Sequence, residues 1–296
     1  MTFLAFASPV PGALGAWLDA RVASGFVFAL PLGLAGLAFL RFLLLKRLGN
    51  STPEPHDPVG RGAAVGLAAV AALLAIVLLP PVLLGAFRPE ASGYASFAPE
   101  PGPASPSSAF ATFGFFALQS LIEELLFRAF LLTLCGSAVL LLARLLFGTL
   151  SGADEPRRAA RRWFVAGLLA NMGQSVAFAS LHAINPNVTP LALLNIGLAG
   201  AVLGWLYWSE GGLLGCWTFH VLWNFTLAAV ALPVSGMSMG APVLATGIRG
   251  AGLPAVSGGA FGPEGSVLST AGLAAVLVFL IRRSARRLPT AYPSLS

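Results

Sequence analysis

Long uncharged, apolar runs alternate along the chain with short polar or basic segments. A run of about 20 apolar residues is enough to span the roughly 30 Å of hydrocarbon in a bilayer. Runs of this kind occupy residues 21–41, 62–87, 109–147, 163–208, 213–232 and 266–281. Pro186 and Pro190 divide the fourth run, because proline cannot continue the hydrogen bonding inside a helix. The pattern therefore predicts an all-α, polytopic transmembrane bundle of about seven to eight helices.

The composition agrees with a membrane protein. Of the 296 residues, 57% are hydrophobic and only 9% are charged, whereas a soluble domain carries roughly 25% charged residues. The net charge of +6 comes from basic residues that flank the apolar runs, as orientation signals do. We therefore expect contact with the lipid bilayer and no nucleic acid. The Arg, Ala, Gly and Leu bias indicates GC-rich coding and favours a bacterial cell membrane.

Basic linkers also orient the predicted helices. The linkers 46–61 and 151–162 and the C-terminal tail are placed in the cytoplasm by their positive charge. These placements agree only if residues 109–147 cross the membrane an odd number of times. We therefore expect one crossing, followed by a bent or interfacial half-helix after Arg128. The predicted regions are an N-terminal two-helix region with a loop (1–108), a core (109–233), and a Gly/Pro-rich loop with a final helix and basic tail (234–296).

Two adjacent carboxylates and an arginine interrupt the run 109–147. A charged residue such as Asp, Lys or Arg near the bilayer centre costs about 2.5 to 3.5 kcal/mol even by mild estimates. Glu124 and Arg128 are four positions apart, so they can pair on one helix face. At the same spacing Glu123 meets Phe127, and its partner must come from another helix. Glu123 is therefore the first candidate for a functional residue.

Two histidines also lie inside apolar runs. His182 shares a helix face with Phe178, and His220 shares one with Asn224, since each pair is four positions apart. A single intramembrane histidine is more often a packing residue than a catalyst. Together with the glutamates, however, these side chains are the parts of a general acid/base site or of a metal site. A nucleophilic Cys216–His220 pair would leave both glutamates unexplained.

Three short motifs thus follow one another, each on an apolar helix. They are Glu123-Glu124-x-x-x-Arg128, Phe178-x-x-x-His182 and His220-x-x-x-Asn224. In this order they resemble the CPBP intramembrane endopeptidases, which comprise the type II CAAX prenyl proteases and the bacteriocin-processing or immunity (Abi) proteins. The resemblance covers about residues 109–233, and it leaves the N-terminal spans and the last span unexplained.

The resemblance implies an intramembrane endopeptidase that hydrolyses a peptide bond in or near the membrane. Its substrate would be a membrane-associated peptide or protein. Glu123 would act as a general base on water with help from His182. His220 and Asn224 would stabilise the oxyanion of the tetrahedral intermediate.

The supporting residues and the cofactor also follow from the resemblance. Glu124 and Arg128 would position the site and balance its charge. We expect a glutamate-type reaction without a cofactor, because the H-E-x-x-H motif of soluble metalloproteases is absent. The alternative is zinc held by His182, His220 and a glutamate, with an open position for water.

Helix lengths leave one geometric question open. If a straight helix begins near Trp163, His182 lies about 29 Å along it, whereas His220 lies only about 12 Å from Gly212. The two histidines can meet only if the helix beginning at Trp163 starts outside the membrane, or if helices tilt, break or re-enter. The sequence does not choose among these arrangements.

Two other classes of function remain open. One is a proton-coupled transporter that uses the carboxylates and histidines as a relay, although the paired halves with broken helices often found in transporters are not visible. The other is a catalytically silent membrane scaffold, such as an immunity or partner-binding protein. The loop 233–265 has no recognisable chemistry, and we expect it only to shape access to the core.

Overall fold

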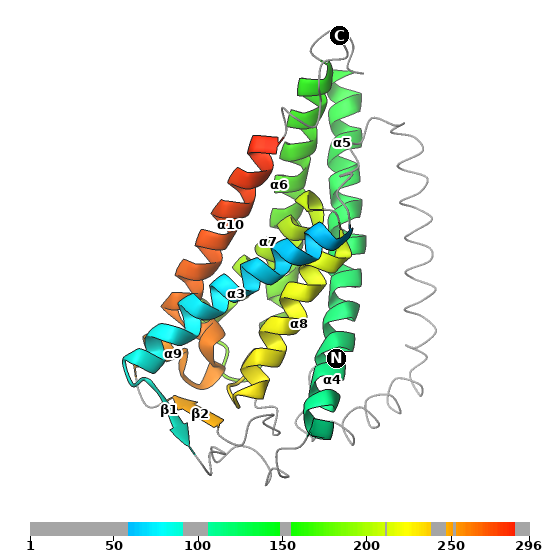
Figure 1. Cartoon of the computed structure of the whole chain (residues 1–296). Coiled ribbons are helices and arrows are strands. Elements are labelled where there is room, and N and C mark those ends of the chain that lie inside the picture. The colour runs from blue at the N-terminus through cyan, green and yellow to red at the C-terminus, as the bar shows by residue number, and fades with distance from the viewer. Residues whose placement is uncertain are drawn as a thin grey trace.

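A bundle of long helices forms the protein (Figure 1). The computed structural model describes residues 59–90, 106–148, 155–210, 212–237, 247–250 and 253–287. The predicted span 21–41 and the linker with His56 lie outside these residues. The main helices are α3 (Val59–Leu83), α4 (Pro106–Glu124), α5 (Thr133–Phe147), α6 (Glu155–His182), α7 (Pro190–Ser209), α8 (Leu213–Ala229) and α10 (Val267–Arg287).

The predicted helical membrane bundle is confirmed, whereas the predicted number of helices is not. Within the described residues, 5 helices are long and apolar enough to cross a membrane. Helix α8 is apolar but has only 17 residues. The break between α6 and α7 falls at Pro186 and Pro190, as expected from their effect on helix hydrogen bonding.

One continuous helix carries the glutamate motif. Helix α4 passes through the π-helical segment η1 (Leu125–Leu132) directly into α5. Residues Ala109–Phe147 thus form one helix of 39 residues, about 58 Å long at the α-helical rise. The separate half-helix expected after Arg128 is therefore not found. Segment η1 contains no proline or glycine that would end the helix, and the Arg128 charge is paired inside the bundle rather than carried to an interface.

The position of α6 explains how the two histidines meet. Helix α6 begins at Glu155 rather than near Trp163, and with α5 it extends well past the start of α8 (Figure 1). Its last turn therefore lies beside the middle of α8, where the rings of Phe178 and His220 are 6.3 Å apart. The offset between the starts of α6 and α8 thus brings the two histidines together.

Helix α3 packs closely on α8 through glycines. A Cβ atom on Gly66 would lie 2.2 Å from the carbonyl oxygen of Gly215, and one on Gly215 would lie 2.7 Å from that of Gly62. Only glycine permits this approach of two backbones. Helix α3 therefore contacts directly the helix that carries His220.

The last helix is tied to the bundle by ion pairs. Helix α10 packs against α7 and α3. At the end of α7, the buried carboxylate of Glu210 accepts hydrogen bonds from Arg283 at 2.9 Å and from Arg287 at 2.8 Å. These pairs hold the far end of α10 against α7.

The predicted loop 233–265 is partly folded. Strand β1 (Phe87–Glu90) pairs antiparallel with β2 (Gly247–Gly250). Three short helices follow: α9 (Pro254–Ser257), η2 (Gly259–Phe261) and η3 (Pro263–Gly265). The strand pair was not predicted, because neither four-residue segment alternates apolar and polar positions.

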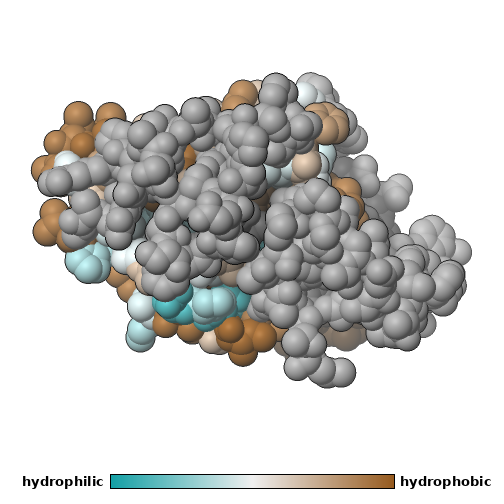
Figure 2. Space-filling view, turned by 90° about the horizontal axis from the view of Figure 1, so that it is seen from below, coloured by the Kyte–Doolittle hydropathy of each residue, from teal (hydrophilic) through white to brown (hydrophobic). Residues whose placement is uncertain are grey.

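Large apolar side chains face outward from the bundle. Seen from the end that carries β1 and β2, the described surface has apolar side chains around much of its rim (Figure 2). Leu67 and Leu83 on α3 and Leu145 on α5 are each more than half exposed. Such surfaces are expected where lipid, rather than water, surrounds a helix.

Candidate active site

Glu124 and Arg128 form a buried ion pair. The Nη1 atom of Arg128 donates to Oε1 of Glu124 at 3.1 Å, and both side chains are fully buried, which confirms the predicted pairing. Arg128 also donates to the carbonyl oxygen of Gly200 at 3.4 Å and lies 4.5 Å from the centroid of the Phe178 ring. A buried pair needs such additional contacts, because its own attraction must offset the loss of hydration.

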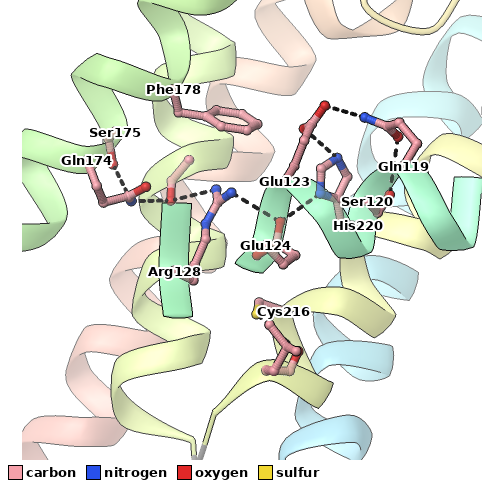
Figure 3. Close-up of polar contacts among 12 residues, drawn as sticks. Gln119, Ser120, Glu123, Glu124, Arg128, Gln174, Ser175, Phe178, Cys216 and His220 are labelled. Atoms are coloured by element: carbon pink, nitrogen blue, oxygen red, sulfur yellow. Dashed lines mark hydrogen bonds and ion pairs between the residues drawn. The ribbon is translucent and has the colours of Figure 1, made fainter. Parts of the chain in front are cut away.

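His220 lies between the two glutamates (Figure 3). Its Nδ1 atom is 2.7 Å from Oε1 of Glu124, and its Nε2 atom is 3.8 Å from Oε2 of Glu123. Because Glu124 is already paired with Arg128, its carboxylate is an acceptor and Nδ1 of His220 carries the hydrogen. The ring therefore presents Nε2 to Glu123. The partner of Glu123 comes from another helix, as expected, and is His220.

Gln119 connects Glu123 to Asn224. Its Nε2 atom donates to Oε1 of Glu123, and its Oε1 atom accepts from Nδ2 of Asn224 at 3.3 Å. Ser120 donates to the same Gln119 oxygen at 3.4 Å. The sequence analysis missed Gln119. The signal that could have found it is its position one helical turn before Glu123, on the same face of an apolar helix.

Polar side chains of α6 bind the same backbone carbonyl of α7 that Arg128 binds. Gln174 donates to the carbonyl oxygen of Gly200 at 2.8 Å and to Oδ1 of Asn171 at 2.6 Å, and Asn171 donates to the carbonyl oxygen of Ala201 at 2.8 Å. Gly200 therefore accepts from both Gln174 and Arg128. Figure 3 shows the resulting chain of contacts, which runs from Ser175 through Arg128 and His220 to Gln119.

A small cavity brings three of the predicted site residues together. It has a volume of about 40 Å³, room for a few water molecules. His182, His220 and Asn224 line it. Nδ1 of His182 lies 2.8 Å from the carbonyl oxygen of Phe178; since a carbonyl can only accept, this nitrogen carries the hydrogen.

Glu123 and Glu124 are not among the residues that line the cavity. Glu123 reaches it through His220, and its side chain is 26% exposed. Among the described residues, no hydrogen bond or ion pair joins Glu123 to His182. The structure therefore brings Glu123 to His220, and it places His182 in the wall of the cavity that His220 also lines.

Glu264 adds an acidic residue to the cavity wall that the sequence did not predict. It belongs to η3 and lines the cavity. Loop 233–265, in which the sequence shows no recognisable chemistry, thus contributes an acidic side chain to the cavity wall. Glu264 is the acidic residue that closes this Gly/Pro/Ser-rich segment immediately before the last apolar run. That position alone gave no reason to place it beside helices far away in the sequence.

The zinc alternative needs at least three convergent protein ligands. No group of three or more His, Cys, Asp or Glu side chains among the described residues is arranged to hold a metal ion. Because Glu123 and Glu124 approach opposite nitrogens of His220, at most one of the two glutamates could share an ion with that ring. Whether the reaction needs a metal stays a prediction to be tested directly.

A comparison with protein families adds independent support. Residues 105–226 match the family model of the Rce1-like type II CAAX prenyl endopeptidases, a segment that holds all three motifs and less than half of the chain. No curated protein and no solved structure matches the chain. The match and the three motifs fall on the same residues, and segment 105–226 is thus similar to the type II CAAX prenyl endopeptidases of the CPBP/CAAX protease family.

Proposed function

We propose that this protein is an intramembrane endopeptidase in which Glu123 and His220 activate a water molecule for attack on a peptide bond. One observation carries the proposal. In the segment that matches the protease family, Oε2 of Glu123 faces Nε2 of His220 at 3.8 Å, and His220 lines one cavity with His182 and Asn224.

Glu123 has the features of a general base. Its Oε2 atom is buried and has no hydrogen-bond partner among the described residues, while Gln119 holds its Oε1 atom. The distance of 3.8 Å to His220 is too long for a direct hydrogen bond and suits a bridging water. Such a water would give its proton to Glu123 as its oxygen bonds to the carbonyl carbon of the substrate.

His220 and Glu124 would keep this base oriented. Arg128 neutralises Glu124, and Glu124 fixes the tautomer of His220 so that Nε2 accepts from the water. This assignment differs from the roles implied by the family resemblance, in which His182 assists Glu123 and His220 stabilises the oxyanion. His220, rather than His182, becomes the partner of Glu123.

Asn224 and His182 would act on the substrate side. The Nδ2 atom of Asn224 has a second hydrogen besides the one given to Gln119, and it would stabilise the oxyanion, a contribution worth about 10² to 10³ in rate. Glu123, protonated by the attacking water, would then give this proton to the leaving nitrogen as the C–N bond breaks. His182, which lines the cavity, would contact the substrate there.

The substrate would be a membrane-associated peptide or protein. The matched family is named for prenyl endopeptidases, so a farnesylated CAAX peptide is the first probe. In a bacterial membrane, leader peptides and membrane proteins are the further candidates.

The test uses the full chain in lipid nanodiscs. The wild type should cleave the farnesylated peptide, whereas Glu123→Gln should lose at least about 10³-fold in kcat with an unchanged melting temperature. Glu90→Gln, placed on β1 outside the bundle, is the matched control and should cleave normally. Equal cleavage by the Glu123→Gln variant would contradict the proposal. Loss of ion-coupled flux without any cleavage would support the transporter alternative.

A further inference from the structure

Glu264 connects the cavity wall to a part of the chain outside the family match. The match ends at residue 226, whereas Glu264 lies in η3. The cavity nevertheless includes Glu264 together with Ser235, Ser269 and Leu273, which also follow the matched segment. The proposed active site is thus completed by a segment that carries none of the three motifs.

Glu264 accepts hydrogen bonds from three separate parts of the cavity wall. Its Oε1 atom accepts from Nε1 of Trp223 on α8 at 2.9 Å, and its Oε2 atom accepts from the backbone N–H of Ser235. Its carbonyl oxygen accepts from Nδ2 of Asn195 on α7 at 2.7 Å. Trp223, Ser235 and Asn195 all line the cavity. One residue therefore joins α7, α8 and the turn that follows α8.

The hydrogen bond between Trp223 and Glu264 involves the helix that carries His220 and Asn224. Trp223 precedes Asn224 in the sequence and lies on the short helix that also carries His220. Helix α8 ends at Ala229 and is followed by a turn in which Ala231 has a φ of 60°. Since only five residues of α8 follow Asn224, the hydrogen bond from Trp223 to Glu264 contributes to how this end of α8 is oriented.

A carboxylate suits this task better than a neutral acceptor. It accepts hydrogen bonds through both oxygens at once, and bonds to an ionised acceptor are stronger than those between neutral groups. Among the described residues no ion pair involves Glu264. Its charge is therefore directed at the two N–H groups, not at a cation.

We propose that Glu264 is a positioning residue for the peptidase reaction. It holds Trp223 and Ser235 so that segment 254–266 closes the cavity and Asn224 faces the reacting carbonyl. The inference rests on the proposed function and extends the catalytic unit beyond the matched segment to η3. Glu264 acts through other residues and does not itself exchange protons with the substrate.

Four variants of the full chain in nanodiscs separate positioning from general stability. Glu264→Leu removes both acceptors at similar size. Trp223→Phe removes only the donor and keeps the aromatic ring. Glu264→Gln keeps an acceptor for Trp223 and is the conservative variant. Trp208→Phe is the matched control, because Nε1 of Trp208 has no partner among the described residues.

The first readout is kcat and KM for the farnesylated peptide. Glu264→Leu and Trp223→Phe should each lower kcat roughly 10- to 100-fold with little change in KM, as expected for a small misplacement of a reacting group. The double variant Glu264→Leu/Trp223→Phe should have a kcat no lower than that of the slower single variant, since both substitutions remove the same hydrogen bond between Trp223 and Glu264. Glu264→Gln, which keeps only one of the two acceptors, should be more active than Glu264→Leu and less active than the wild type, and Trp208→Phe should keep the full activity. A Glu264→Leu variant with wild-type kcat, an effect on KM alone, or multiplicative losses in the double variant would each overturn the inference.

The second readout needs no activity, so it stays informative even if the wild type does not cleave the peptide. A cysteine at Ala199, which lines the cavity, is labelled with a small methanethiosulfonate reagent. Glu264→Leu should raise the labelling rate at this position about tenfold, the order of a modest loss of closure, and leave that of the native Cys135 unchanged. An unchanged rate at position 199 would overturn the closing role. An inactive wild type would count against the proposed function alone.

Discussion

The Nδ1 atom of His220 lies 2.7 Å from Oε1 of Glu124, a fully buried carboxylate that is also paired with Arg128. Glu123 and Glu124 are neighbours in the sequence, but their contacts differ, and so do the roles we propose for them. Glu124 belongs to a buried ion-pair network, whereas Oε2 of Glu123 has no hydrogen-bond partner among the described residues. The two carboxylates should therefore respond differently to the same substitution.

Glu124→Gln should destabilise the protein, unlike Glu123→Gln. Removing one member of a buried pair leaves the other charge uncompensated, which costs about 3 to 5 kcal/mol. We expect a clear fall in the melting temperature of Glu124→Gln, measured by thermal unfolding in detergent. Adding Arg128→Met should restore part of that stability without restoring cleavage. If the melting temperature of Glu124→Gln equals that of the wild type, the Glu124–Arg128 pair does not stabilise the protein as proposed.

Gln119 should matter for rate more than for stability. Gln119→Met keeps the size of the side chain but removes the donor to Glu123 and the acceptor for Asn224. We expect kcat to fall roughly 10- to 100-fold with a melting temperature close to that of the wild type, measured on the nanodisc preparation. Ser180→Ala on α6, where the serine bonds only to the backbone of its own helix, is a control that should leave kcat unchanged. Full activity in Gln119→Met would show that the orientation of Glu123 does not depend on this amide.

Helix α3 should be required for folding although it lies outside the family match. Gly66→Val places a side chain against the backbone of Gly215, and overpacking of this kind costs about 1 to 3 kcal/mol. We expect a lower melting temperature and lower activity. Gly60→Val is the control, since a Cβ there meets nothing within 4 Å. Equal melting of the two variants would mean that α3 and α8 are not packed as described.

Metal chelation should leave the activity unchanged. Glu123 and Glu124 approach opposite nitrogens of His220, and the proposed reaction takes its base from the chain itself. Cleavage of the farnesylated peptide after treatment with 1,10-phenanthroline should equal that of untreated protein. Loss of activity on chelation, with recovery on added zinc, would contradict the metal-independent reaction.

Much of the architecture was predictable from the sequence, because membrane helices leave a local signal. The apolar runs located α6, α7 and α10, and the i, i+4 spacing located the Glu124–Arg128 pair. The ionisable residues inside those runs identified Glu123, His182 and His220 as candidates, because such residues are costly there.

The rest depends on contacts between distant segments. Hydropathy placed the start of α6 near Trp163 rather than at Glu155, and it gave no offset between the starts of α6 and α8, so it could not show which histidine faces Glu123. Gln119 is polar but uncharged, and its role appears only when Asn224 is placed beside it. Glu264 lies in a segment without helical periodicity, and its contacts with Trp223 and Ser235 span 41 and 29 residues of chain.

The most direct measurement of the central claim compares protein N-termini in membranes of host cells that express the wild type or Glu123→Ala at matched levels. The account predicts new N-termini that appear only with the wild type, and these termini would name the substrate and its cleavage site. Identical sets of termini, with both proteins folded and equally abundant, would contradict the claim that the chain is a protease.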